Sequence, residues 1–123
     1  MNYETINSAL MHKFPELAPR FEEQFNAWNS KDIPAHCFLG DSLNVYLVEL
    51  LRKNHDKNQI KKIFEFYECL AYSEDERVRD LLQVTLLEYL WDEKVVYENA
   101  LQYMLPKTFQ INSSIGAYIR MPF

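Results

Sequence analysis

Glycine is scarce in this sequence, because only Gly40 and Gly116 occur among its 123 residues. Proteins rich in β-strands normally need more glycine for their tight turns, so the scarcity favours a helical protein. Two glycines cannot build a glycine-rich phosphate-binding loop, and the Gly-x-Ser-x-Gly motif of serine hydrolases does not occur. The low glycine content therefore excludes both kinds of site.

Cysteine and histidine are also few, and they are scattered along the chain. Cys37 and Cys69 are too few for a disulfide framework, and we expect two reduced, buried thiols. His36 precedes Cys37 directly, but adjacent side chains diverge on a helix or a strand and do not readily form a catalytic pair. His12 and His55 stand alone, whereas a zinc site needs four ligands. We therefore predict no catalytic residue, no metal site and no cofactor, and a protein that is not an enzyme.

The sequence has no excess of basic residues and no long apolar run. Its net charge is -5 and its pI is about 5.2, which disfavours direct binding of nucleic acid. No apolar run approaches the length of about 18 residues that a membrane span needs. Residues 1–14 lack the basic start and the apolar core of a secretory signal. We therefore expect a cytoplasmic protein that does not act at a membrane.

The chain does contain enough apolar residues for a folded core, since 48% of it is hydrophobic and 15% is aromatic. Its length fits one domain spanning residues 1–123. Apolar residues recur at spacings of three and four, which predicts helices. The predicted helices run over residues 3–13, from between Pro15 and Pro19 to about 28, and over about 41–53, 57–72, 75–93 and 93–104, with one more possible after 107.

These segments predict an all-α fold of five or six antiparallel helices, because short links make neighbouring helices antiparallel. Successive pairs would form a helical-hairpin stack that resembles a short α-solenoid, and a compact orthogonal bundle is the alternative. Ser73 with Glu76, and Asp56 with Gln59, have the spacing of capping boxes and predict two helix starts.

The segment IPAHCFLGDS, residues 33–42, raises the question of a functional site because it joins His36 to Cys37. We interpret it as a structural connector that leads the chain into the third helix. Phe38 and Leu39 would anchor it, and Asp41 would cap the helix.

The fifth predicted helix, residues 75–93, is apolar almost all round, so we expect it to be the most buried. The third helix carries more than one apolar stripe and is expected to be central. On a helical wheel Glu88 lies opposite the polar stripe of the fifth helix. We therefore predict a buried carboxylate at Glu88 that binds backbone N–H groups of a neighbouring helix start or connector. A role toward a partner or in acid–base chemistry is the alternative.

Charge is unevenly distributed along the chain. Residues 65–98 contain ten acidic and three basic residues, a net charge of -7. A basic patch precedes them, made of Arg52, Lys53, Lys57, Lys61 and Lys62. The acidic half could mimic nucleic acid toward a basic nuclease, and the alternative is an ordinary solvated surface.

Four strings carry a family resemblance: FPEL, IPAHCFLGDSLNVYLVELL, IKKIFEFYECLAYSEDERVRDLLQVTLLEYLWDE and ALQYMLPKT. Over residues 14–108 the chain resembles small bacterial helical proteins that look like immunity proteins of contact-dependent and other polymorphic toxin systems. The resemblance lies in the pattern of helices and links. It implies a protein that binds and neutralises a cognate toxin domain, and it supplies no catalytic residue.

Our first functional hypothesis is therefore a toxin-immunity protein whose partner is a toxin domain, expected to be a nuclease. The alternative is a helical-repeat adaptor that binds another cellular protein without inhibiting it. An acidic face would favour the first hypothesis, and an apolar groove would favour binding of a peptide or helix. The predicted contact residues are Glu74, Asp75, Glu76, Asp80, Asp92 and Glu93, with Tyr97 as an aromatic anchor.

Overall fold

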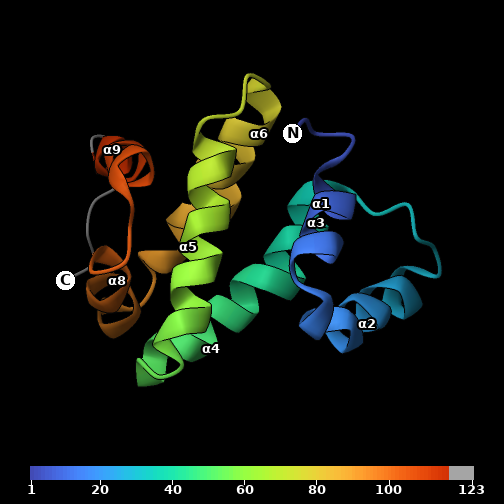
Figure 1. The fold of residues 1–123 in the computed structure, drawn as a ribbon, viewed down its shortest axis with the longest axis horizontal. Helices are drawn as coiled ribbons and strands as arrows, with labels where there is room; N and C mark the ends of the chain where they lie inside the picture. Colours follow the sequence, from blue (N-terminus) through green and yellow to red (C-terminus); the bar gives the residue numbers. More distant parts are fainter. Residues whose placement is uncertain (117–123) are drawn as a thin grey trace.

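The computed structural model describes residues 1–116, which form an all-α arrangement (Figure 1). The α-helices are α1 (Ile6–Lys13), α2 (Ala18–Trp28), α3 (Ala35–Phe38), α4 (Val45–Lys53), α5 (Lys57–Ala71), α6 (Glu76–Asp80), α7 (Glu88–Leu90), α8 (Lys94–Leu101) and α9 (Pro106–Ile115). A 3₁₀ turn, η1 (Pro15–Leu17), leads into α2.

Two π-helical segments join some of these helices end to end. Segment η2 (Leu39–Asn44) links α3 to α4, and segment η3 (Leu81–Leu87) links α6 to α7. The chain therefore forms one continuous helix over residues 35–53 and another over residues 76–90. Counted in this way, residues 1–116 form seven helices, so the all-α prediction is confirmed and the predicted number of five or six is too low.

Helix α5 is the centre of the arrangement. It contacts α4, α6, η3 and α9, and Figure 1 shows it between α8 and α9 on one side and α1, α2 and α3 on the other. It buries seven of its fifteen residues. The helix of residues 76–90 buries six, one in α6, four in η3 and one in α7. The prediction that this fifth helix is the most buried is therefore wrong.

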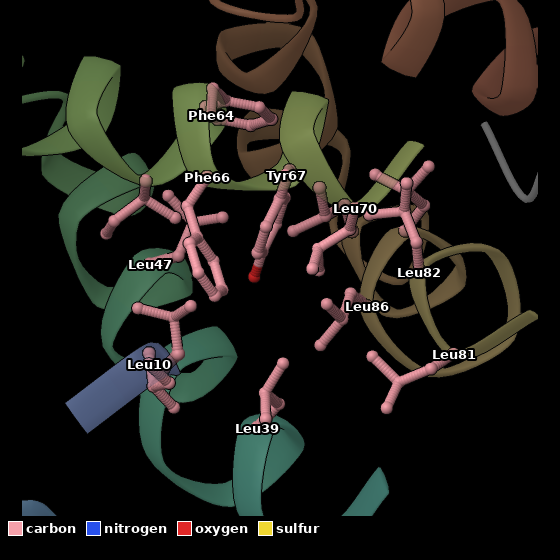
Figure 2. Close-up of a cluster of buried hydrophobic side chains, with 14 of the residues drawn as sticks. Leu10, Leu39, Leu47, Phe64, Phe66, Tyr67, Leu70, Leu81, Leu82 and Leu86 are labelled. Carbon is pink, nitrogen blue, oxygen red and sulfur yellow. The ribbon is translucent and has the colours of Figure 1, made fainter. Parts of the chain in front are cut away.

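The core is one cluster of buried side chains that surrounds Tyr67 of α5 (Figure 2). The Tyr67 hydroxyl donates a hydrogen bond of 2.7 Å to Asn44 Oδ1, and Asn44 Nδ2 donates one of 3.2 Å to the Leu86 carbonyl. Burial raises the pKa of Tyr67. Because both polar side chains are buried and bonded to each other, they link α5, η2 and η3 without an unsatisfied group.

The helix starts differ from the predicted capping boxes. The N-cap of α6 is Asp75, whose carboxylate accepts a hydrogen bond from the Arg77 N–H, while Ser73 Oγ donates to the Met1 carbonyl at 2.7 Å. Asp56 precedes α5 but makes no capping bond, and Gln59 donates to Glu16 instead. Both predicted boxes are therefore wrong, because Ser73 and Gln59 bind residues far away in the sequence and Asp56 makes no capping bond.

The segment around His36 is part of a helix. Pro34 is extended, and the helix of residues 35–53 begins directly after it, earlier than the predicted start at Asp41. Asp41 lies inside η2 and is exposed, so the prediction of an N-cap there is wrong. Phe38 and Leu39 are fully buried, as predicted for anchors.

No helix within residues 1–116 has the length and apolar character to cross a membrane.

Candidate functional site

A groove of about 600 Å³ runs between the helix of residues 35–53 and the helix of residues 76–90. His36, Cys37 and Gly40 line it on the first helix, and Thr85 lines it on the second. The other lining residues include apolar and charged side chains. The segment that we interpreted as a connector therefore lines this groove.

The two π-helical segments approach each other closely at Gly40 and Thr85. A Cβ atom on Gly40 would lie 3.3 Å from Cγ2 of Thr85, so glycine at this position allows the approach. Across the same contact, His36 Nδ1 lies 2.5 Å from Thr85 Oγ1. Short π-helical insertions in α-helices frequently occur at functional sites, which directs attention to this place.

The apolar wall of the groove is open to solvent. Val45 is 45% exposed, Val84 53% and Tyr89 61%. Val48 is half-buried beside them. These residues belong to the two helices in which the sequence shows more apolar positions than one buried stripe requires. The extra apolar residues thus form a surface wall, whereas the sequence pattern had predicted burial.

Negative charge predominates among the charged residues of the groove. Four carboxylates, from Asp41, Glu49, Asp92 and Glu93, face a single guanidinium, that of Arg52. Arg52 Nε donates to Glu93 Oε2 at 2.9 Å, and this pairing lowers the pKa of Glu93. Asp41 and Asp92 are exposed and form no ion pair with any residue of the described chain. Their charges are therefore available to an external partner.

Four of the predicted contact residues are exposed and make no ion pair within residues 1–116. They are Glu74, Glu76, Asp80 and Asp92. Glu74, Glu76 and Asp80 lie at or just before the start of the helix of residues 76–90, and Asp92 lies just after its end. Of these four, only Asp92 lines the groove.

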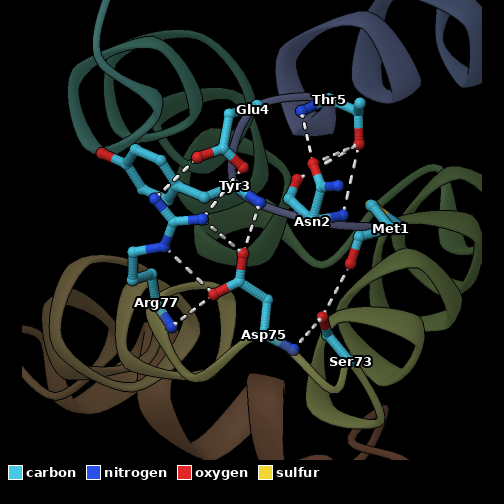
Figure 3. Close-up of polar contacts among 8 residues, drawn as sticks. All are labelled: Met1, Asn2, Tyr3, Glu4, Thr5, Ser73, Asp75 and Arg77. Atoms are coloured by element: carbon cyan, nitrogen blue, oxygen red, sulfur yellow. Dashed lines mark hydrogen bonds and ion pairs between the residues drawn. The ribbon is translucent and has the colours of Figure 1, made fainter.

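The half-buried carboxylate of Asp75 is bound by other residues of the chain. Its carboxylate accepts a hydrogen bond of 2.9 Å from the Tyr3 backbone N–H and pairs with Arg77, which also binds Glu4 (Figure 3). The bonds from Arg77 and then from Tyr3 lower the pKa of Asp75 to about 2. Asp75 therefore fastens the N-terminal segment to the start of α6, and its carboxylate is already bound within the protein. That it contacts a partner stays a prediction.

Two further predicted contact residues, Glu93 and Tyr97, also interact with other residues of the chain. Glu93 is paired with Arg52. Tyr97 is only 8% exposed, its ring centroid lies 4.5 Å from that of Trp91, and its hydroxyl accepts a hydrogen bond from Asn112. Tyr97 is therefore part of the core between α8 and α9 and cannot serve as an aromatic anchor for a partner.

Glu88 is half-buried rather than buried, and no residue of the described chain donates a hydrogen bond to its carboxylate, so that prediction is wrong. The helical wheel failed because η3 lies before Glu88, and its i→i+5 hydrogen bonds rotate the following residues away from their α-helical positions.

The carboxylate that binds backbone N–H groups at the start of a neighbouring helix is that of Glu68, and not that of Glu88. Its carboxylate accepts the N–H groups of Lys107 at 3.0 Å and of Thr108 at 2.7 Å, at the start of α9.

The cysteine thiols and the groups that could bind a metal ion are considered together. Cys37 is half-buried in the groove and Cys69 is exposed on α5, so the expectation of two buried thiols is wrong. Within the described residues, no three His, Cys, Asp or Glu side chains lie close enough together to hold a metal ion. The groove can therefore offer apolar contact, hydrogen bonds and charge.

Of the predicted contacts, Asp92 and Glu93 line this groove. Sequence reasoning missed its apolar wall of Val45, Val84 and Tyr89. The one available signal was the excess of apolar positions in the third and fifth predicted helices. That signal indicates apolar surface as well as core, and only the packing of the two helices decides between them.

No curated protein and no solved structure matches the chain. A family model matches residues 7–120, which is nearly the whole chain. The chain therefore belongs to the family described as Domain of unknown function (DUF7674).

Proposed function

We propose that this protein is an immunity protein, which binds a cognate bacterial toxin domain with a basic surface and neutralises it. The observation that carries the proposal is the set of exposed carboxylates, without an ion pair among residues 1–116, on the helix of residues 76–90 and just after it. Glu76 and Asp80 lie near its start, and Asp92 follows its end. The resemblance of residues 14–108 to immunity proteins supports the same function.

The charge of this surface suits a nuclease as the toxin. Nucleases bind a polyanion and therefore carry basic surfaces, which an acidic inhibitor can cover. Opposite charges also accelerate encounter, an advantage for a protein that must capture a toxin before it acts. We place this action in the cytoplasm, where two free thiols such as Cys37 and Cys69 stay reduced.

The test reverses three charges on the proposed binding surface. Glu76, Asp80 and Asp92 are replaced together by lysine, and affinity for the toxin domain encoded beside the gene is measured by calorimetry. Affinity should fall by more than about tenfold, and the loss should be larger at low salt. Co-expression with the toxin should then no longer protect growing cells.

The matched control makes the same change of charge elsewhere. Glu22, Glu23 and Glu65 are exposed, lie on α2 and α5, and make no ion pair within residues 1–116. Their replacement by lysine should leave affinity and protection nearly unchanged. Equal losses in both triple variants would mean that only net charge matters, and failure of the wild-type protein to bind or protect would reject the proposed function.

An adaptor function is the second candidate, and the groove is the observation that favours it. Exposed apolar side chains between two helices suit the binding of a peptide or helix from any cellular protein. The two functions differ in their effect on cells. An adaptor would leave the toxicity of the neighbouring toxin domain unchanged, whereas an immunity protein would abolish it.

A further inference from the structure

We propose that the groove between residues 35–53 and 76–90 receives an amphipathic helix of the toxin, whose apolar side chains enter it beside lysine or arginine. This inference rests on the proposed function and specifies its binding site. It states which surface holds the partner and which chemistry the partner must present.

The wall of the groove supplies the apolar part of this recognition. Val45, Val84 and Tyr89 are each between 45% and 61% exposed, and they converge on one groove from two helices. Burial of such side chains against a partner removes apolar surface from water, which is the main driving force of association. A groove walled by two helices accepts the apolar face of a third helix, as in other helix-in-groove complexes.

The charged residues of the groove determine which charge the partner helix must carry beside its apolar side chains. The groove carries four carboxylates and one guanidinium. Two of the carboxylates, Glu49 and Glu93, are already paired with Arg20 and Arg52. Asp41 and Asp92 have no such partner among the described residues. Lysine or arginine residues beside the apolar side chains of the partner helix would therefore form ion pairs with these two carboxylates. An acidic or purely apolar helix would leave these charges uncompensated.

The groove is held open by contacts that do not involve the proposed partner. Asn44 donates to the Leu86 carbonyl, and His36 bonds to Thr85, so both bonds join the two helices that line the groove. Gly40 allows the two π-helical segments to meet. A groove that is already formed costs less ordering on binding than a surface that must rearrange.

The first experiment removes the apolar wall and has a control of the same residue types. The variant V84A/Y89A truncates two exposed groove residues, and Y72A/V95A truncates exposed residues outside the groove, at 67% and 55% exposure. We expect V84A/Y89A to weaken binding of the toxin domain by more than about tenfold, and Y72A/V95A by less than about twofold.

The two cysteines provide a second readout within one molecule. Cys37 lines the groove, whereas Cys69 lies outside it. Alkylation of each thiol by iodoacetamide is followed by mass spectrometry, with and without saturating toxin domain. A helix in the groove should slow the modification of Cys37 strongly and leave that of Cys69 unchanged.

The charge requirement is tested by salt dependence. The variant D41N/D92N should bind the toxin domain more weakly than the wild-type protein and lose affinity less steeply as salt is raised. Replacement of Glu22 and Glu23 by glutamine should change neither value, because these residues lie on α2 and do not line the groove. If the affinity of D41N/D92N depends on salt as steeply as that of the wild-type protein, the partner helix does not place lysine or arginine against these two residues.

The outcomes separate this inference from the proposed function. If the toxin domain binds the wild-type protein and V84A/Y89A equally well, and Cys37 stays reactive, the groove inference is overturned while the immunity function stands. If the wild-type protein does not bind the toxin domain, both fall. If the protein alone sediments as a dimer that V84A/Y89A splits, the occupant is a second copy of this chain, which also overturns the inference.

Discussion

The helix of residues 76–90 has two apolar faces with different surroundings. On the inner face Leu82 and Leu86 are fully buried in the core against α5 (Figure 2). On the outer face Val84 and Tyr89 are more than half exposed and line the groove. The residue types are similar, yet one face stabilises the fold and the other is free to bind. An apolar circumference therefore does not by itself indicate burial.

The largest difference between the faces should appear in stability. Leu82→Ala removes a buried side chain and leaves a cavity, so we expect a loss of about 2–5 kcal/mol in the free energy of unfolding. Val84→Ala, two residues away but exposed, should change it by less than about 0.5 kcal/mol. Urea denaturation measures both values. Similar losses in the two variants would contradict the distinction between the faces.

A smaller effect is expected at the polar link beneath the groove. Tyr67→Phe removes the hydroxyl that donates to Asn44 Oδ1 and leaves this buried oxygen without its donor. An unsatisfied buried acceptor costs about 1–3 kcal/mol, so the free energy of unfolding should fall by that amount. The same denaturation experiment tests it, and a variant as stable as the wild-type protein would show that the bond contributes nothing.

The smallest effect concerns the start of the same helix and depends on pH. The pKa of Asp75 is lowered to about 2, from an ordinary value of about 3.9. Its contribution to stability is therefore fully present above about pH 4 and is lost as the pH falls toward 2. Asp75→Asn should be less stable than the wild-type protein at pH 7, and the difference should shrink as the pH falls toward 2.

The matched variant for this measurement is Glu76→Gln, because Glu76 is exposed and has no ion pair within the described chain. Its stability should differ little from that of the wild-type protein, and the difference should be nearly independent of pH. A constant difference between Asp75→Asn and the wild-type protein from pH 7 to pH 2 would show that the carboxylate charge is not what holds the N-terminal segment.

Local patterns in the sequence predicted the fold class well. They failed where contacts between residues far apart in the sequence determine the position of a side chain or the cap of a helix. Apolar spacing located most of the helices, because that spacing reflects which face is buried. It could not reveal η3, since i→i+5 bonds leave no simple mark on the sequence, and the position of Glu88 was misjudged for this reason. The capping spacing of Ser73 and Glu76 misled because Ser73 binds the Met1 carbonyl instead.

The candidate site was only partly predictable. The acidity of Glu76, Asp80 and Asp92 is visible in the sequence, and all three are exposed. Pairings such as Arg52 with Glu93, and Asp75 with the Tyr3 N–H, join residues more than 40 positions apart and depend on how the helices pack. The groove likewise exists only once η2 and η3 meet at Gly40 and Thr85.

The most direct test of the account is the affinity of the toxin domain encoded beside the gene for the wild-type protein and for V84A/Y89A, measured by calorimetry on variants of equal stability. If the outer face of the helix binds the partner, the dissociation constant should rise by more than about tenfold in V84A/Y89A and stay within about twofold in Y72A/V95A. Equal affinities for the wild-type protein and V84A/Y89A would contradict the claim that this face is the binding surface.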